Sequence, residues 1–166
     1  MPEGKSGTDS IRDLWLKTAR GRLRLGLGGL AFAMERGFSP EDYARHLWGK
    51  GARTWMGKDE PSAAEYLDKE AEAFRCFYPD VDFKVTRAGE ESAEIVFTEG
   101  CLGGWGDAPR ALASSFGLTR EDVCRYCREA FRLWAGQLRL LATIGPEGSD
   151  TRCVLRVQRA ASHRRP

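Results

Sequence analysis

Four of the five cysteines are spaced so that they could act together in one site. They form the pattern C-x22-C-x2-C-x25-C, with Cys101, Cys124, Cys127 and Cys153 at its four positions. Cys124 and Cys127 are three residues apart in a segment that reads as a helix, so their side chains share one face. They lie in the first turns of that helix, where the helix dipole and the neighbouring arginines favour the thiolate form.

A thiolate is both a nucleophile and a metal ligand, so the pattern leaves two kinds of chemistry open. As a nucleophile, Cys101 or Cys124 would act with Asp150 or Asp122, either of which could orient a proton acceptor. As ligands, Cys101, Cys124, Cys127 and Cys153 would bind Zn²⁺ or an Fe–S cluster through four sulfurs. A third interpretation is that these cysteines only pack in the hydrophobic core, because a free cysteine behaves as a small hydrophobe. We assign the fifth cysteine, Cys76, to packing.

Cys101 lies in a glycine-rich segment, residues 100–106, that follows a predicted strand. Glycines allow the backbone to approach a ligand closely, and Trp105 would form a wall of the pocket. We therefore expect Gly103, Gly104, Trp105 and Arg125 to bind a substrate. A second glycine-rich stretch, residues 25–29, follows no strand and lacks the spacing of a dinucleotide loop, so it predicts close helix packing.

The composition describes a soluble globular protein. The 166 residues carry a net charge of +2, with 42% hydrophobic and 30% charged residues, so nothing predicts a nucleic-acid partner. No apolar stretch is long enough to cross a membrane, and no targeting segment is recognisable. An odd number of cysteines argues against a disulfide framework. We expect a cytoplasmic protein with no membrane partner; the sequence leaves its oligomeric state open.

The hydrophobic pattern predicts an α+β domain. Helical spacing of apolar residues covers residues 11–36, a segment opened by Ser39 and Pro40, and residues 58–77. Alternation then predicts a hairpin over 81–98 and, after helices at 107–117 and from Thr119 onward, strands at 138–143 and 153–158. We expect the N-terminal helices to pack on an antiparallel sheet built from two hairpins. This single domain, residues 10–158, would lie between a disordered N-terminus, residues 1–9, and a basic tail, residues 159–166.

Four segments of the second half carry a resemblance to a known family. They are a strand that runs into a cysteine, 94–101; a capped helix containing Cys124, from residue 116; a strand with a glycine-containing turn, 143–150; and a strand led by Cys153, 153–157. Over about 60 residues the chain resembles the L-2-amino-thiazoline-4-carboxylic acid hydrolase family. More distantly, it is similar to small-molecule-binding domains of the vinyl-reductase type.

The resemblance implies hydrolytic opening of a cyclic C–N bond in a small sulfur heterocycle. The chain departs from the family pattern at Cys127, where the family usually has Asp, and at Val154 and Leu155, where it usually has Asp-Phe. The first change replaces a carboxylate by a thiol, which favours a metal site or a redox-sensitive pair.

Three hypotheses follow for the function. The first is a cysteine-dependent hydrolase of a small heterocyclic or amide-like substrate, as the resemblance implies. The second is a four-cysteine protein that binds Zn²⁺ or Fe–S. The third is a non-catalytic module or sensor that binds a small molecule between the helices and the sheet. With only two histidines in the chain, proton transfers in an enzyme would rely on thiols, carboxylates or a metal-bound water.

Overall fold

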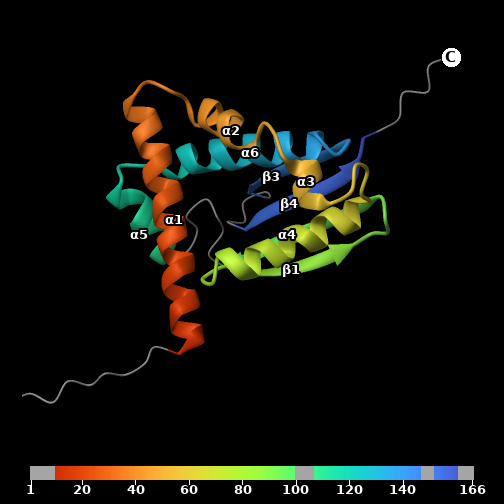
Figure 1. The fold of residues 1–166 in the computed structure, drawn as a ribbon, viewed down its shortest axis with the longest axis horizontal. Helices are drawn as coiled ribbons and strands as arrows, with labels where there is room; N and C mark the ends of the chain where they lie inside the picture. The colour runs from red at the N-terminus through yellow and green to blue at the C-terminus, as the bar shows by residue number, and fades with distance from the viewer. Residues whose placement is uncertain (1–9, 100–106, 147–151, 161–166) are drawn as a thin grey trace, which may run out of the picture.

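The computed structural model describes residues 10–99, 107–146 and 152–160 and confirms the α+β fold class (Figure 1). Its helices are α1 (Ile11–Glu35), α2 (Pro40–Trp48), α3 (Ala52–Met56), α4 (Ala63–Phe77), α5 (Asp107–Ser115) and α6 (Arg120–Gly136). Its strands are β1 (Asp82–Arg87), β2 (Ser92–Glu99), β3 (Leu140–Pro146) and β4 (Cys153–Arg159). The predicted disordered N-terminus lies outside the described residues. The last strand includes Arg159, the first residue assigned to the basic tail.

Capping boxes fix the starts of four helices. In each, a Ser or Thr side chain accepts a hydrogen bond from the backbone three residues on, and the acidic residue there binds back to the cap. The pairs are Ser10 with Asp13, Ser39 with Asp42, Ser62 with Glu65, and Thr119 with Asp122. The starts predicted at Ser39 and Thr119 are confirmed, whereas α4 begins at Ala63, a few residues later than its predicted opening.

The four strands form one antiparallel sheet in the order β1-β2-β4-β3. Each hairpin pairs internally, and the two hairpins join where β2 lies beside β4. This is the predicted arrangement. The second hairpin extends further than expected, because Gly145 and Pro146 pair with β4, at Val154 and Cys153.

One face of the sheet is covered by helices, and the other carries mostly exposed or half-buried described side chains, with Val154 of β4 buried among them. On the covered face, Ile95 and Phe97 of β2 lie opposite Leu155 and Cys153 of β4, and all four are buried. The open face carries charged pairs such as Arg156 with Glu94. The sheet therefore alternates between apolar and polar residues, as expected for a sheet packed on one side.

The helices α4 and α6 lie along the covered face, with α3 between them at one end and α1 across the other (Figure 1). α4 packs on β2 and β4, whereas α6 packs on β3 and carries α2 on its outer side. α1 is tied to α4 by the Trp15 indole nitrogen, which donates to the Cys76 carbonyl at 2.8 Å. This arrangement leaves large side chains to fill the space between α4 and α6.

Close helix packing, predicted for the glycines of residues 25–29, is confirmed at Gly28 and Gly29 but not at Gly26, which has open space beside it. A Cβ atom added to Gly29 would lie 2.3 Å from the Tyr43 hydroxyl, and one added to Gly28 would touch Phe116. Absence of a side chain therefore lets α2 and the end of α5 approach α1. None of the helices in the described part of the chain has the length and apolarity needed to span a membrane.

Candidate functional site

The structure places three of the four predicted site cysteines. Cys127 is buried on α6, and Cys153 is buried at the start of β4, opposite Phe97 on the covered face. Cys124 is partly exposed. The inward direction predicted for Cys153 from strand alternation is confirmed. The packing role predicted for Cys76 is wrong, because that residue is exposed.

Several predicted site residues lie outside the described residues, namely Cys101, Gly103, Gly104, Trp105 and Asp150. Within the described ranges, no three His, Cys, Asp or Glu residues come together in a way that could hold a metal ion. Because Cys101 is outside those ranges, the four-thiolate Zn²⁺ or Fe–S site stays a prediction, and so does a nucleophilic role for Cys101 or Cys124.

Arg125, predicted to bind substrate, forms a two-point ion pair with Glu41. Its Nε and Nη2 donate to the two carboxylate oxygens at 2.7 and 2.8 Å. This pair links α6 to α2. Beside it, buried Glu129 accepts from Arg132 on its own helix at 2.7 Å and from Arg45 of α2 at 3.0 Å. These ion pairs hold α2 on the outer face of α6.

A buried carboxyl and a buried hydroxyl lie one turn apart on α4. Tyr66 is 0% exposed and Glu70 is 7% exposed. Burial raises the pKa of Glu70 from 4.5 to about 7, because an ionised carboxylate loses its hydration there. The Tyr66 hydroxyl is close enough to Glu70 for a weak hydrogen-bonding interaction to lower that pKa, yet it makes no hydrogen bond of ordinary geometry with any described residue.

From Glu70, further polar groups continue across the interior to α6. Glu70 is near enough to Tyr78 to contribute to the raised pKa of its hydroxyl, which burial, the largest cause, brings to about 12. Cys127 acts on Tyr78 in the same way, and on Tyr126, whose pKa is also raised chiefly by burial. We call this set the interior polar row: Tyr66, Glu70 and Cys127, which are buried, and Tyr78 and Tyr126, which are half-buried.

The two ends of the interior polar row differ in how well they are hydrogen-bonded. At the α6 end, the Tyr126 hydroxyl accepts a hydrogen bond from the Trp48 indole nitrogen at 2.6 Å. At the α4 end, the Tyr66 hydroxyl has no such partner among the described residues. Buried polar groups are nearly always satisfied in folded proteins, so the α4 end is the part that requires an explanation.

Aromatic rings form the walls around this α4 end. Trp55 of α3 packs on the Tyr66 ring, with centroids 6.3 Å apart, and on the Trp134 ring at 5.7 Å. One turn beyond Glu70, Phe74 packs on Tyr78 at 6.2 Å and on Phe131 of α6 at 6.0 Å. Along α4, Glu70 thus lies between Tyr66, which packs on Trp55, and Phe74, which packs on Phe131.

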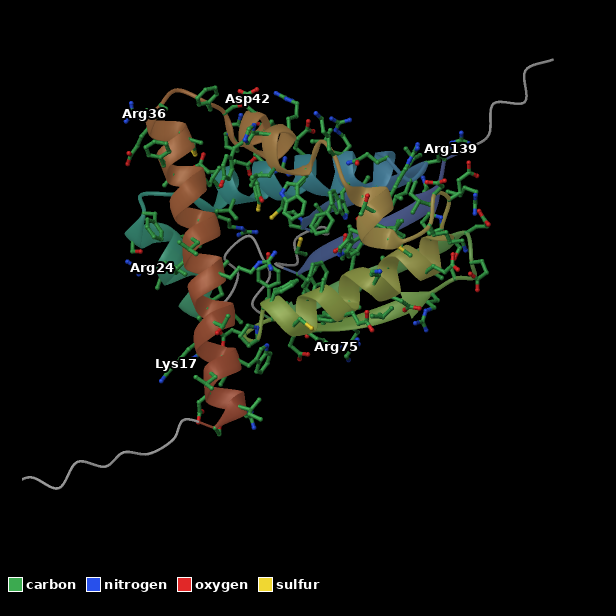
Figure 2. The ribbon with its side chains drawn as sticks, in the orientation of Figure 1. Lys17, Arg24, Arg36, Asp42, Arg75 and Arg139 are labelled. Carbon is green, nitrogen blue, oxygen red and sulfur yellow. The ribbon has the colours of Figure 1, made fainter. Side chains whose placement is uncertain are left out.

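The exterior shows the usual distribution of charge. Figure 2 labels Lys17, Arg24, Arg36, Asp42, Arg75 and Arg139, all on the outside of the molecule. Glu70 is different, since no described cation forms an ion pair with it. The adjacent Lys69 instead donates to the Met56 carbonyl at 3.4 Å and lies 5.5 Å from the Trp55 ring centroid.

Sequence reasoning missed Glu70, although the sequence contains a signal. Residues 63, 67, 70 and 74 follow the i, i+4, i+7, i+11 spacing of one helical face, and all of them except Glu70 are apolar. A lone glutamate on an apolar stripe is the pattern expected of a buried acid. Such an acid can bind a cation, donate a proton when neutral, or accept one when ionised.

Comparison with known proteins gives no family. No family model matches the chain, and no curated protein matches it. Among solved structures, it is similar to trafficking protein particle complex subunit 3 from Naegleria fowleri, crystallised covalently bound to palmitic acid. That match has 17% identity and a TM-score of 0.44, and it covers 86% of this chain and 95% of that one.

The chain is also similar to the Fe(II) unliganded H-NOX protein from K. algicida. That match has 13% identity and a TM-score of 0.42, and it covers 96% of this chain and 78% of that one. A mutant of the same H-NOX protein matches at 12% identity and a TM-score of 0.40, over 98% of this chain and 83% of that one. With TM-scores below 0.5, these likenesses say nothing of what this chain binds.

Proposed function

We propose that this chain binds a small organic molecule between α4 and α6, at the α4 end of the interior polar row. The observation that carries the proposal is the pairing of a buried carboxyl, Glu70, with a buried hydroxyl, Tyr66, that has no hydrogen-bond partner among the described residues. Leaving one buried polar group unsatisfied costs about 1–3 kcal/mol. A ligand that supplied the missing partner would recover this free energy.

The surrounding side chains support a ligand of small size with a flat apolar part. Small-molecule sites are mostly apolar and aromatic, with a few polar groups that fix orientation. Tyr66, Trp55 and Trp134 form one aromatic layer, and Phe74 and Tyr78 form another. Glu70 lies between the two layers along α4, so it would provide the directional contact.

A fragment library with mapping of backbone amide NMR shifts tests this proposal. We expect bound fragments to shift the amides of Tyr66, Glu70 and Tyr78 on α4 and those around Cys127 on α6. The outer face of α2, which is separated from the interior by α6, serves as an internal control. A library that binds nowhere, or that shifts only residues outside the α4–α6 interior, contradicts the proposal.

A cysteine-dependent hydrolase is the second candidate, and the raised pKa of Glu70 favours it. A carboxyl that titrates near neutral pH is suited to acid–base catalysis. In this scheme a thiolate, Cys101 or Cys124, adds to the ring carbon of a cyclic substrate and the C–N bond breaks. The leaving nitrogen takes a proton from Glu70, and water then adds to the thioimidate carbon, expels the cysteine as thiolate and returns a proton to Glu70.

The hydrolase candidate is tested by measuring how fast wild type and the C101S, C124S and E70Q variants hydrolyse 2-amino-thiazoline-4-carboxylate. Loss of turnover in E70Q together with loss in one cysteine variant supports the scheme. Unchanged turnover in both C101S and C124S excludes it. The four-cysteine metal hypothesis is tested separately by elemental analysis of anaerobically purified protein, where a metal-free and stably folded sample excludes it.

A further inference from the structure

We infer that the ligand carries a positively charged nitrogen group, an ammonium or an amidinium, which the Glu70 carboxylate binds between the aromatic layers of α3 and α4. This inference rests on the proposed function and specifies the chemical class of the ligand. It follows from three observations: the carboxyl is buried, its electrostatic surroundings contain no described counter-ion, and the rings beside it are of the kind that attract cations.

The first observation is the position of Glu70 on the apolar face of α4. Its neighbours one turn away are Tyr66 and Phe74, which are 0% and 2% exposed, and the residue itself is 7% exposed. A carboxylate in such a place needs a positive partner or a proton. A ligand group that binds at this position must therefore carry a positive charge or supply a proton.

The second observation is the absence of a described cation that fills this role. Burial raises the pKa of Glu70, and among the described residues the other contribution comes from the Tyr66 hydroxyl. Lys69 points to Met56 and Trp55, and Arg22 of α1 lies over the Phe77 ring, 3.7 Å from its centroid. Arg22 acts on Tyr78, whose pKa it lowers, and it is not among the groups that act on Glu70.

The groups that face Glu70 are otherwise neutral or acidic. Tyr66 lies on its own helix, Tyr78 lies at the end of that helix, and Cys127 of α6 lies beyond Tyr78. Arg22 of α1 is the cation that reaches Tyr78 from the other side. None of these groups balances an ionised Glu70, so the interior as described favours an incoming positive charge and disfavours an anion.

The third observation concerns the rings. A cation is attracted to the face of an aromatic ring by about 0.5–2 kcal/mol, depending on how far it is desolvated. Tyr66 lies one turn from Glu70 on α4 and packs on the Trp55 ring at 6.3 Å, and Tyr78 is near enough for Glu70 to act on its pKa, so these rings would add this attraction to the ion pair. A planar amidinium would in addition make two parallel hydrogen bonds to the carboxylate. The Tyr66 hydroxyl then gains a neighbour with which to form its missing hydrogen bond.

The test compares two probes of nearly equal shape by isothermal titration calorimetry, benzamidine, which is cationic, and benzamide, which is neutral. We expect wild-type protein at pH 8 to bind benzamidine at least tenfold more tightly than benzamide. E70Q should lose this preference, because glutamine has nearly the same shape without the charge. Glu72→Gln, which removes an exposed carboxyl from the same helix, should keep it.

Proton release gives a second readout that a merely structural effect of E70Q would not reproduce. At pH 6 the carboxyl is mostly protonated, so binding the cation must displace about one proton. The affinity for benzamidine should then be about tenfold lower at pH 6 than at pH 8. The binding heat at pH 6 should depend on the ionisation enthalpy of the buffer in wild type and in Glu72→Gln.

Equal affinity for the two probes, no binding of either probe, or a benzamidine preference that persists in E70Q overturns the inference. The proposed function has a separate outcome. If neutral or anionic fragments shift the amides between α4 and α6 while benzamidine does not bind, the ligand class is wrong and the site stands. If no fragment binds in that interior, both are wrong.

Discussion

Tyr66 and Glu70 lie one helical turn apart on α4, both buried, and the hydroxyl of one makes no ordinary hydrogen bond although the carboxyl of the other is beside it. The relationship differs from that at the other end of the interior polar row, where Trp48 donates to Tyr126 at 2.6 Å. The interior polar row thus has one end whose hydroxyl is hydrogen-bonded and one end whose hydroxyl has no hydrogen-bond partner among the described residues.

Glu70 makes the free protein less stable as the pH rises. Its folded-state pKa, about 7, is above its ordinary value of 4.5, so the folded state holds the proton more tightly and loses this advantage on ionisation. We expect the free energy of unfolding of wild type to fall by about 2–3 kcal/mol between pH 5 and pH 8 relative to E70Q. Urea unfolding at the two pH values measures this difference.

The Glu72→Gln variant is the matched control for that experiment. It removes a carboxyl from the exposed side of α4, so its pH dependence should follow wild type. If E70Q loses stability with pH in parallel with wild type, the carboxyl is not the buried titrating group described above.

Removing the hydroxyl from Tyr66 and from Tyr126 should have opposite effects on stability. Y66F deletes a buried group without a hydrogen-bond partner among the described residues, so it should leave the ligand-free protein as stable as wild type or stabilise it by about 1 kcal/mol. Y126F removes the acceptor of the Trp48 indole nitrogen and should cost about 1–3 kcal/mol. Chemical denaturation of both variants under one condition gives the comparison.

A destabilisation of Y66F as large as that of Y126F would mean that the Tyr66 hydroxyl has a hydrogen-bond partner in the free protein.

The Y66F and Y126F variants also test where the ligand binds. Y66F should weaken benzamidine binding, whereas a folded Y126F should keep it, because Tyr126 lies at the far end of the interior polar row.

Glu129 should stabilise the protein in the opposite pH sense from Glu70. Its arginine neighbours, Arg132 foremost, hold the pKa of its carboxyl below the ordinary value. This stabilisation is present above the unfolded-state pKa and is lost as the pH falls through the folded-state pKa. The side chain is 11% exposed but those of Arg132 and Arg45 are 61% and 52% exposed, so we expect E129Q to cost only about 1 kcal/mol at pH 7.

Thermal unfolding of E129Q at pH 7 and pH 4 checks this. The difference in melting temperature between wild type and E129Q should be smaller at pH 4 than at pH 7. Glu41→Gln, which breaks the pair with Arg125 and removes a carboxylate that is more exposed than that of Glu129, should have a smaller effect. An E129Q defect that grows at low pH is incompatible with the described ion pairs.

Thiol labelling should separate the described cysteines by burial. Cys76 is exposed and should react first with iodoacetamide, Cys124 should react more slowly, and the buried Cys127 and Cys153 should react only on unfolding. Peptide mass spectrometry of time points assigns each site. Rapid labelling of Cys127 in the folded protein would contradict its buried position on α6.

The elements that sequence reasoning predicted well depend on local signals. The capping boxes at Ser39 and Thr119 act within three residues, and strand alternation is sufficient to direct Cys153 inward. α3 was not predicted because it is only one short turn set between Gly51 and Gly57, both with positive φ. Local patterns carry little information about so short a helix.

The candidate site was harder to predict because it depends on packing between distant segments. Cysteine spacing drew attention to α6, but whether Cys101 meets Cys124 depends on long-range packing that spacing does not encode. The neighbours of Cys76 in the sequence predict that it packs in the core. The buried face of α4 ends at Phe74, however, so Cys76 is exposed. Glu70 follows that stripe, but only the tertiary fold makes it a buried acid without a described counter-ion.

The most direct test of this account is a carbon-13 NMR titration of the glutamate carboxyls, with E70Q identifying the Glu70 signal. In the free protein we predict that Glu70 titrates near pH 7. With saturating benzamidine, its midpoint should fall by more than one pH unit, because the bound cation stabilises the carboxylate. A midpoint near 4.5 in the free protein, or one that benzamidine leaves unchanged, would contradict the claim that Glu70 is the buried ligand-binding group.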